Sequence, residues 1–467
     1  MNFNKVGIDD VSFFKSVIGG KYVLDDKELL TIAASDQTED LVHMPELVLQ
    51  PADTDEVSKV LAYCNKRLLP VTTRGAGTGL SGGALPAFGG VVLDMRRMNS
   101  IVNLDTDNFQ VTVEPGIITQ ELQEHVQAHG LFYPPDPASK GSCFIGGNVA
   151  ESSGGPKAVK YGVVKDYVLN LEVVLPTGDV MWTGANVLKN ATGYNLTQLI
   201  VGSEGTLAVI TKIVLRLIPA VQHDLLLLVP FRSATEACSA VNAVMLSGIT
   251  PSALEFMERD ALDWAMRYTE SSAVTLPDDI QAHLLIELDG NYPETLYKEA
   301  EQVTAVLQGF DTGDILFADS HEQKQMLWAL RRKVGEAVKS NSVYKEEDTV
   351  VPRAALPELL SVVKRLGQKY GFRSVCYGHA GDGNLHINIV KGDMNDDDWN
   401  NKLPVAIREL FKETVRMGGT ISGEHGIGLV QKQYIDIAFG KTQLELMKAI
   451  KTTFDPNGIL NPGKIFT

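Results

Sequence analysis

The sequence has few cysteines and no long apolar run, and each shortage excludes a class of protein. Its four cysteines lie far apart among 467 residues, and no pair has the spacing of a zinc, redox or iron–sulfur motif. We therefore expect reduced thiols in a cytoplasmic protein. No apolar stretch reaches the length that crosses a bilayer, and we find no signal-peptide pattern at the N-terminus. Any contact with the inner membrane is expected to be peripheral and through a partner.

Basic residues are also in the minority. The chain has 42 Lys and Arg against 58 Asp and Glu, which gives a formal net charge of −16. Such an acidic surface repels phosphate backbones and argues against nucleic-acid binding. Hydrophobic residues at 44% and charged residues at 21% are typical of a globular protein. A chain of this length predicts two or three domains.

The pattern of apolar residues changes along the chain. Residues 1–40 predict a short helical arm, and residues 41–219 predict strands and helices joined by glycine-rich loops. Residues 220–453 alternate strand-like and helical runs, which is typical of an α+β domain whose sheet is covered by helices. Residues 454–467 form a separate closing segment. The fold class expected for the whole chain is α+β.

A glycine-rich loop, RGAGTGLSGG, occupies residues 74–83 directly after a predicted strand. Glycines allow backbone N–H groups to crowd around an anion, and a diphosphate is the natural guest. A Rossmann loop for NAD would carry glycine at the position of Leu80 and would open a helix at once. Neither condition holds, so we exclude NAD and retain a plain glycine-rich turn as the alternative.

Two further segments accompany this loop, YPPDPASKGSCFIGGNVAESSGG at 133–155 and GSEGTLAVIT at 202–211. Together they resemble the FAD-binding domain of the vanillyl-alcohol oxidase superfamily, in particular its glycolate and D-lactate dehydrogenase branch. The resemblance implies a two-part domain that binds FAD, with non-covalent attachment because Ala76 stands where some relatives carry a flavin-linked histidine. The residues that it assigns to FAD here are Arg74, Gly75, Ala76, Gly77, Thr78, Gly79, Ser81, Pro135, Asp136, Ser139, Gly146, Gly147, Asn148, Ser153, Gly205 and Ile210.

Two motifs in the second half carry histidines, YGHAGDGNLHIN at 377–388 and ISGEHGIGL at 421–429. His379 and His386 bracket a Gly-Asp-Gly turn that can fold them toward one point, and His386 shares a face with Asn388 if the segment is a strand. Two imidazoles and a carboxylate form a common metal-ligand set, which suits Zn or Mn. The alternative is a hydrogen-bonded turn with scattered histidines.

These motifs and the closing FDPNGILNPGKIF resemble the C-terminal domain of FAD-linked oxidases. The likeness to D-lactate and D-2-hydroxyglutarate dehydrogenases covers nearly the whole chain beyond residue 40. It implies an α+β cap domain that binds metal and substrate, followed by a C-terminus that returns to the flavin. It assigns the metal to His379, His386 and Glu424, the catalytic base to His425, and a flavin contact to Asn461.

Three residues are candidates for substrate binding. Arg331 lies on a predicted helix, and a buried arginine can clamp a carboxylate with two hydrogen bonds. The alternative is a solvated basic face, which we prefer for its neighbours Arg332 and Lys333. Asn388 occupies a position that holds a second carboxylate in the D-2-hydroxyglutarate branch. Lys345 is a weaker candidate for the same role, because it is offset by one residue from the family spacing.

The resemblance implies an FAD-dependent dehydrogenase of a small D-2-hydroxy acid, D-lactate or glycolate first and D-2-hydroxyglutarate as the alternative. His425 would deprotonate a metal-bound hydroxyl while hydride moves to the flavin. No haem or iron–sulfur motif is present, so we expect an external acceptor: a quinone, a cytochrome, an electron-transfer flavoprotein or an iron–sulfur subunit. A homodimer is left open.

Two other classes compete with this hypothesis. A non-catalytic flavin subunit of a glycolate oxidase complex should lack the metal and base motifs, and both are present here. An ether-lipid synthase of the same superfamily should carry a much longer N-terminal region and a peroxisomal address, and we find neither in this sequence.

Overall fold

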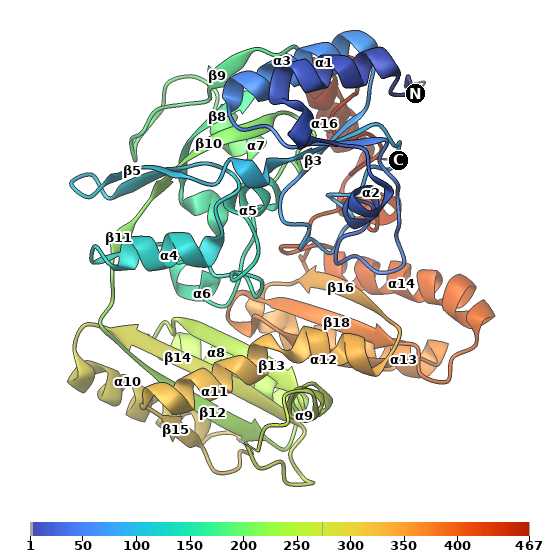
Figure 1. Cartoon of the computed structure of the whole chain (residues 1–467). Helices are drawn as coiled ribbons and strands as arrows, with labels where there is room; N and C mark the ends of the chain where they lie inside the picture. Colours follow the sequence, from blue (N-terminus) through green and yellow to red (C-terminus); the bar gives the residue numbers. More distant parts are fainter. Residues whose placement is uncertain (1–2, 273, 467) are drawn as a thin grey trace. The chain divides into compact units, whose positions relative to one another are not determined.

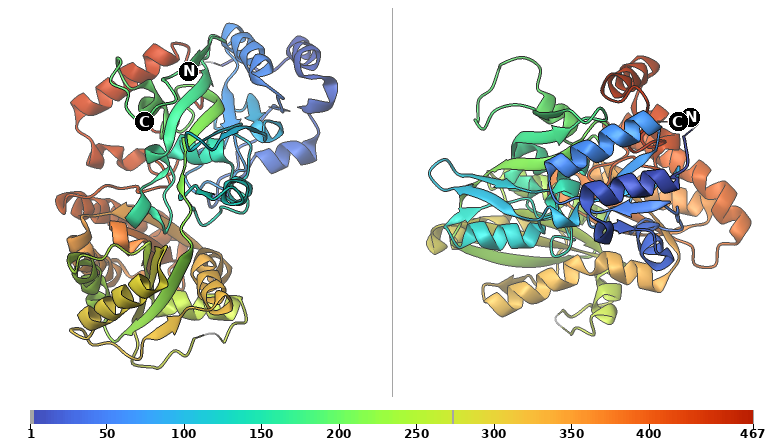
Figure 2. Two further views of the ribbon diagram at one scale, coloured as in Figure 1. Left: turned by 90° about the vertical axis from the view of Figure 1, so that its left-hand side faces the viewer. Right: turned by 45° about the horizontal axis from the view of Figure 1, so that its top comes forward.

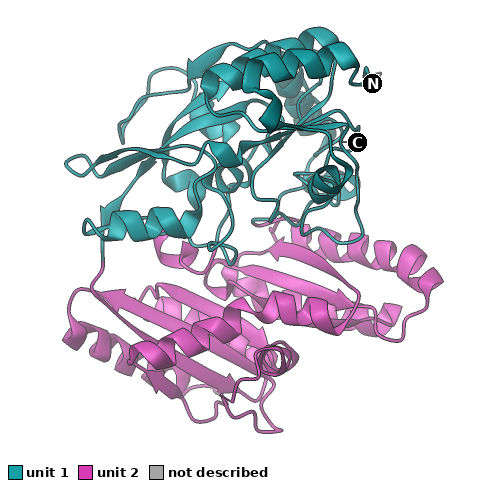
Figure 3. Cartoon of the chain, in the orientation of Figure 1, with its two compact units in different colours: residues 1–154, 163–220, 424–467 teal, residues 155–162, 221–423 magenta. Residues whose placement is uncertain are grey.

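The structure, a computed structural model, describes residues 3–272 and 274–466. These residues form two compact units, which Figure 3 shows in separate colours. Each unit is built from segments that are distant in the sequence. Unit 1 comprises Met1–Gly154, Val163–Ala220 and Glu424–Thr467, and unit 2 comprises Gly155–Gly162 and Val221–Gly423.

The division differs from the predicted one near the C-terminus. The sequence predicts one domain over 220–453, whereas the structure returns the chain to unit 1 from Glu424 onward. The carboxylate of Glu204 accepts hydrogen bonds from the backbone N–H groups of Ile427 and Gly428, at 2.8 and 2.7 Å. These contacts hold the start of the returning segment in unit 1, and no residue pattern in the sequence indicates them.

A shorter segment, residues 155–162, belongs to unit 2 although the sequence predicts it within the FAD-binding domain. It carries α6 (Ala158–Tyr161). Lys160 Nζ lies 2.6 Å from Oδ1 of Asp289, and the Tyr161 hydroxyl donates to the same carboxylate. Because Asp289 is buried, these partners compensate a charge that would otherwise be costly.

The N-terminal arm contains the expected short helices, α1 (Ile8–Ile18) and α2 (Lys27–Ala33). It is part of unit 1, because α1 packs along α3 (Thr54–Arg67), as Figures 1 and 2 show. The ring of Phe13 stacks on Tyr63 with centroids 3.9 Å apart, and Phe14 is fully buried. Asp53 caps α3 by accepting a hydrogen bond from the N–H of Glu56.

Unit 1 contains two main sheets. The first is a four-stranded sheet in the order β1-β2-β4-β3, in which β2 and β3 both run parallel to β4. The second is a five-stranded antiparallel sheet in the order β5-β6-β10-β8-β9. The strands of the first sheet are β1 (Val23–Leu24), β2 (Leu47–Leu49), β3 (Val71–Arg74) and β4 (Val91–Asp94). Those of the second are β5 (Ile101–Asp105), β6 (Gln110–Val113), β8 (Val168–Val174), β9 (Val180–Trp182) and β10 (Val209–Arg216).

The closing segment of the chain completes the core of unit 1. Leu460 forms a parallel bridge with Val71, and both Ile459 and Leu460 are fully buried among residues of α1, α3 and the first sheet. This burial explains why the C-terminus returns to this unit. The remaining elements of unit 1 are α4 (Thr119–Gln127), β7 (Leu131–Phe132), α5 (Ile145–Glu151), α7 (Leu196–Ile200), β11 (Ile218–Pro219), α15 (Ile435–Ala438) and α16 (Lys441–Phe454).

Unit 2 is built on one seven-stranded antiparallel sheet in the order β15-β12-β14-β13-β17-β18-β16 (Figure 1). Together with unit 1 it confirms the predicted α+β class. The strands are β12 (His223–Phe231), β13 (Ala253–Glu258), β14 (Ala282–Gly290), β15 (Leu316–Ala318), β16 (Tyr344–Val350), β17 (Arg373–Gly378) and β18 (Asn384–Val390). Besides α6, its α-helices are α8 (Ala234–Leu246), α9 (Arg259–Tyr268), α10 (Pro293–Leu307), α11 (His321–Arg332), α12 (Val334–Asn341), α13 (Leu356–Tyr370) and α14 (Leu403–Arg416).

One face of this sheet combines an apolar core with a polar area. Alternate residues such as Met257, Leu285 and Val375 pack against α9, α11 and α12 in a buried cluster. Strand alternation places Glu255, two residues before Met257, on the same face. The polar side chains described below therefore share a face with the core. Among the described residues, no helix is long and apolar enough to cross a membrane.

Candidate active site

A cavity in unit 1 gathers most of the residues that the sequence predicts for FAD. Its wall combines the glycine-rich loop after β3, the residues around α5 and the start of β10. The Cβ positions of Gly79 and Gly147 would meet no atom within 4 Å, so both face open space. Of the predicted residues, those that line the cavity are Gly75, Ala76, Gly77, Thr78, Gly79, Ser139, Gly146, Gly147, Asn148, Ser153, Gly205, Ile210 and Asn461.

The loop needs glycine at one position in particular. Gly77 has φ of +74°, and a Cβ atom there would collide with the guanidinium of Arg74. Arg74 is buried beneath the loop instead of lining the cavity. Burial lowers its pKa, although the charges of Asp36 and Asp94 oppose this effect. A buried cation under a glycine-rich loop that lines the cavity complements a diphosphate, so the residues present fit an FAD pyrophosphate.

Three further predicted residues lie outside the cavity lining. The carbonyl of Ser81 accepts a hydrogen bond from the N–H of Leu429, and the carbonyl of Pro135 accepts one from the Gln123 side chain. Asp136 is buried. Ser81 and Pro135 therefore shape the loops around the cavity, and direct contact of these three residues with FAD stays a prediction.

Two acidic residues that the sequence analysis missed also line the cavity, Glu151 and Glu204. Burial raises the pKa of Glu151 well above its usual range, and the charge of Glu204 adds to the effect. Burial also raises the pKa of Glu204. Lys464 is buried as well, which lowers its pKa to about 7 despite the charges of Glu204 and Glu151. Glu204 lies within the GSEGTLAVIT motif, which could have marked it.

Glu424 and His425 line this same cavity of unit 1. The backbone N–H of Gly154 donates a 3.1 Å hydrogen bond to Oε2 of Glu424. Sequence analysis assigned both residues to the cap domain, yet they belong to the FAD-binding unit. The imidazole predicted to act as the base therefore shares a cavity with the loops predicted to hold the flavin.

The two histidines of the YGHAGDGNLHIN motif lie close together in unit 2. A 3₁₀ turn over Ala380–Asp382 joins β17 to β18 and folds the chain back. The rings of His379 and His386 are nearly perpendicular, with centroids 5.3 Å apart, and both are buried. The Nδ1 atom of His379 lies 2.9 Å from each carboxylate oxygen of Glu255. Neutral imidazoles with an oriented Nδ1 atom are typical metal ligands, so this pair fits a divalent ion.

Arg331 is buried at the end of α11, as the carboxylate-binding hypothesis requires. Its Nη2 lies 2.6 Å from Oε2 of Glu255, and its guanidinium carbon lies 5.1 Å from the ring centroid of Tyr377. Its Nε atom is buried and has no hydrogen-bond partner among the described residues. Its neighbours are more exposed, and Lys333 pairs with Glu336 on the helix surface.

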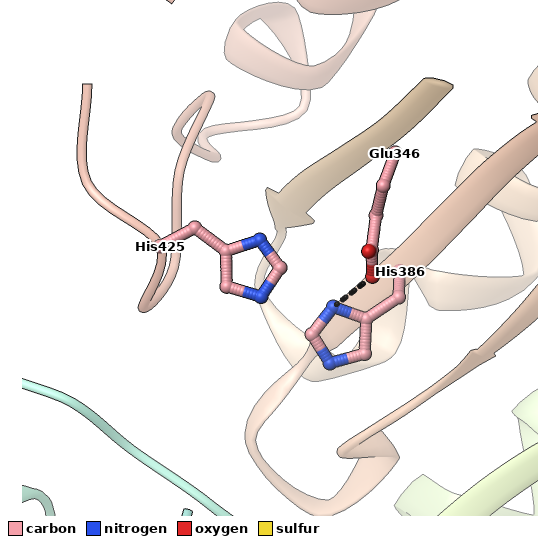
Figure 4. Close-up of side chains that lie close together, drawn as sticks. All are labelled: Glu346, His386 and His425. Atoms are coloured by element: carbon pink, nitrogen blue, oxygen red, sulfur yellow. Dashed lines mark ion pairs between the residues drawn. The ribbon is translucent and has the colours of Figure 1, made fainter. Parts of the chain in front are cut away.

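Strand register determines which of the remaining polar side chains in this area lie next to each other. On β16 and β18, Glu346 pairs with Asn388 and Asp348 pairs with His386. Figure 4 shows the ion pair between Glu346 and Nδ1 of His386, at 3.6 Å; His425, also drawn there, belongs to unit 1. Asn388 is fully buried, and its side-chain amide lies beside the hydroxyl of Tyr377.

Lys345, the weaker substrate candidate, lies on the other face of β16, because neighbouring residues alternate. Its Nζ lies 5.6 Å from the ring centroid of Trp399. The structure therefore gives the position beside Asn388 to Glu346, and we do not carry the substrate role of Lys345 further. Glu255 and Glu346 had no signal in the sequence, since neither lies in a motif that the sequence analysis used.

The geometry defines a class of protein: a cofactor-dependent enzyme with a glycine-lined nucleotide cavity in one unit and a buried histidine–arginine cluster in the other. Residues 45–184 match the model of the FAD binding domain, and residues 221–465 match that of the C-terminal domain of FAD linked oxidases. The chain belongs to the FAD-linked oxidase family, as its motifs predict, and its cofactor is FAD.

Several relatives extend this match over most of the chain. Glycolate oxidase subunit GlcD of Bacillus subtilis is 38% identical, with coverage of 92% of this chain and 91% of the relative. D-lactate dehydrogenase of Anaerostipes hadrus is 36% identical, and the match covers 99% of this chain and 98% of the relative. A probable D-2-hydroxyglutarate dehydrogenase of Oryza sativa is 35% identical, and the match covers 99% of this chain and 82% of the relative. The solved structure of p-cresol methylhydroxylase shares the fold, with a TM-score of 0.78, 20% identity and coverage of 97% and 96%.

Proposed function

We propose that this chain oxidises a small D-2-hydroxy acid, D-lactate or glycolate, to the 2-oxo acid. One observation carries the proposal: the buried Nε donor of Arg331 has no hydrogen-bond partner among the described residues, in the unit that holds two close histidines. Unpaired buried donors are costly, and a substrate carboxylate would satisfy them. The names of the relatives from Bacillus subtilis and Anaerostipes hadrus support this substrate class.

The roles of the residues follow from their chemistry. FAD, when bound in the cavity of unit 1, would supply the acceptor for the hydride from C2 of the substrate. His379, His386 and Glu424 would hold a divalent ion, Zn or Mn, which supplies a Lewis acid for the substrate hydroxyl. His425 removes the hydroxyl proton, since an imidazole titrates near neutral pH. Arg331 fixes the substrate carboxylate.

The second candidate is a D-2-hydroxyglutarate dehydrogenase, which the rice relative supports. Asn388 favours it, because a buried amide can donate to a second carboxylate. Glu346 opposes it, because its carboxylate faces Asn388 in strand register and is 12% exposed. Two like charges at short range repel each other, so we place the monocarboxylate substrates first.

The reduced flavin needs an external acceptor, because the four cysteines are isolated and buried. A quinone, a cytochrome, an electron-transfer flavoprotein or an iron–sulfur subunit would serve, and the word subunit in the name of one relative supports a protein partner. We propose a cytoplasmic location for this activity.

The test begins with the purified protein. We expect a flavin spectrum, FAD release by acid precipitation, and bleaching of the flavin by D-lactate or glycolate with an artificial dye as acceptor. L-lactate is the matched control for the substrate. Removal of metal by a chelator, checked by elemental analysis, should stop dye reduction while FAD stays bound. A flavoprotein that no D-2-hydroxy acid reduces, with its metal present, would favour the non-catalytic subunit.

A further inference from the structure

One carboxylate in unit 2 contacts both groups on which the proposed chemistry depends. Glu255 lies in the middle of β13, and its side chain is fully buried. Its two oxygens lie 2.9 Å from Nδ1 of His379, and Oε2 lies 2.6 Å from Nη2 of Arg331. The proposed function uses both partners but gives Glu255 no role.

The sheet fixes this arrangement. Register between β13 and β17 pairs Met257 with Tyr377 and Phe256 with Gly378, so its continuation places Glu255 opposite His379. Arg331 arrives from α11 and lies over the ring of Tyr377. The carboxylate therefore stands on a central strand, while its two partners come from a turn and from the end of a helix.

Burial of this carboxylate has a physical consequence. An isolated buried charge is costly, and it is tolerated when partners compensate it. His379 and Arg331 are those partners, because their nitrogen atoms lie 2.9 and 2.6 Å from the Glu255 oxygens. Glu255 thus remains an acceptor for both groups, and each group is fixed in orientation by it.

The two contacts serve different purposes. A carboxylate that accepts from the Nδ1–H of an imidazole selects the tautomer whose Nε2 carries the lone pair, which is the form that binds a metal. A carboxylate on Nη2 of an arginine fixes the plane of the guanidinium and leaves other N–H groups to bind a ligand carboxylate. The Nε atom of Arg331 is such a group.

We propose that Glu255 is a positioning residue that couples metal affinity to substrate binding, by holding His379 and Arg331 in one arrangement. The inference rests on the proposed function and adds a residue to it. It requires that loss of the Glu255 charge weaken metal binding and raise KM together. If Glu255 were merely structural, its replacement would lower stability and leave both the metal affinity and KM unchanged.

The test compares Glu255→Gln with Glu287→Gln in the holoenzyme. Glu287 is the matched control, because it is also a buried carboxylate of this sheet, paired with Lys157 and bonded by Ser252 and Trp328. We expect Glu255→Gln to weaken Zn²⁺ binding by about 10- to 100-fold in competition with a chromogenic chelator. At saturating metal it should also raise KM for D-lactate. Glu287→Gln should lower the Tm alone.

Glu255→Asp keeps the charge but draws the carboxylate back by one methylene, so its metal affinity should lie between those of Glu255→Gln and the parent. This variant also keeps the test decisive if Glu255→Gln fails to fold. A folded Glu255 variant with parental metal affinity and KM would overturn the inference. A parent protein that binds no divalent metal would instead overturn the metal part of the proposed function, and the two failures are thereby distinguished.

Discussion

The backbone N–H of Gly154 donates a hydrogen bond to Oε2 of Glu424, although 270 residues separate them in the sequence. Gly154 directly follows Ser153, which lines the cavity of unit 1, and Glu424 begins the last segment of that unit. The bond therefore fixes the start of this segment at the cavity wall. His425, the next residue, lines the same cavity, which is a suitable place for a base acting beside a flavin.

The first prediction concerns this histidine. A base acts on a proton that moves only as the reaction proceeds, so His425→Ala should lower kcat by about 10²- to 10⁴-fold. Flavin reduction in a single turnover separates this step from reoxidation. His129→Ala, an exposed histidine in the same unit, is the control and should reduce its flavin at the parental rate. Equal rates for His425→Ala and the parent would assign the base to another group.

The second prediction concerns Arg331, which we propose binds the substrate carboxylate, a group present in both the ground and the transition state. Arg331→Lys keeps the charge but loses the planar, two-pronged geometry. We expect KM for D-lactate to rise by at least about tenfold, which is the worth of one charge-assisted hydrogen bond. A smaller fall in kcat should accompany it. Arg332→Lys on the same helix should leave both constants unchanged, and an unchanged KM in Arg331→Lys would remove this residue from the substrate site.

The sequence predicts the family, the fold class and most of the cavity because its motifs are local. A loop such as residues 74–83 carries its own conformation, since glycine permits positive φ at Gly77 whatever surrounds it. Glu255 and Glu346 could not be predicted in this way. Strand register brings Glu255 to His379, which is 124 residues away in the sequence, and it brings Glu346 to Asn388. An alternating strand pattern does not reveal which acidic side chain will be buried.

The difference between local patterns and contacts of distant residues also explains the domain boundaries. The change near Pro219 coincides with a change in residue pattern, and the structure divides the chain at Ala220. The return at Glu424 depends on hydrogen bonds from Glu204 to two backbone N–H groups, which any residue could supply. Backbone partners carry no residue identity, so the sequence places this boundary about 30 residues late.

The third prediction tests the glycine-rich loop. Gly77→Ala should weaken FAD binding strongly, because its Cβ would displace the guanidinium of Arg74 from beneath the loop. Gly130→Ala is a close control: Gly130 also has φ of +74°, but its Cβ would meet no atom within 4 Å. The control should lose about 1 kcal/mol of stability and keep its FAD. Equal FAD content in the two variants, measured from flavin absorbance, would contradict the prediction. The clash with Arg74 would then add nothing to the backbone strain that both variants share.

The last prediction concerns stability in acid. His283 on β14 is 1% exposed, and burial, followed by the charge of Arg259, lowers its pKa to about 4. In the unfolded chain its pKa returns to near 6.5. Between these values the unfolded state binds a proton that the folded state does not. The folded state therefore loses stability as the pH falls from about 6.5 to 4, by about 3 kcal/mol in all.

The variant that tests this effect is His283→Gln, which cannot titrate. Urea unfolding of unit 2 should be followed by tryptophan fluorescence at pH 7 and at pH 4.5. The parent is expected to lose more stability than His283→Gln over this interval, with the difference approaching about 3 kcal/mol at still lower pH. Other groups titrate equally in both proteins and cancel. Parallel pH profiles would mean that His283 takes up its proton in the folded state, and that the interior of the sheet accommodates the charge.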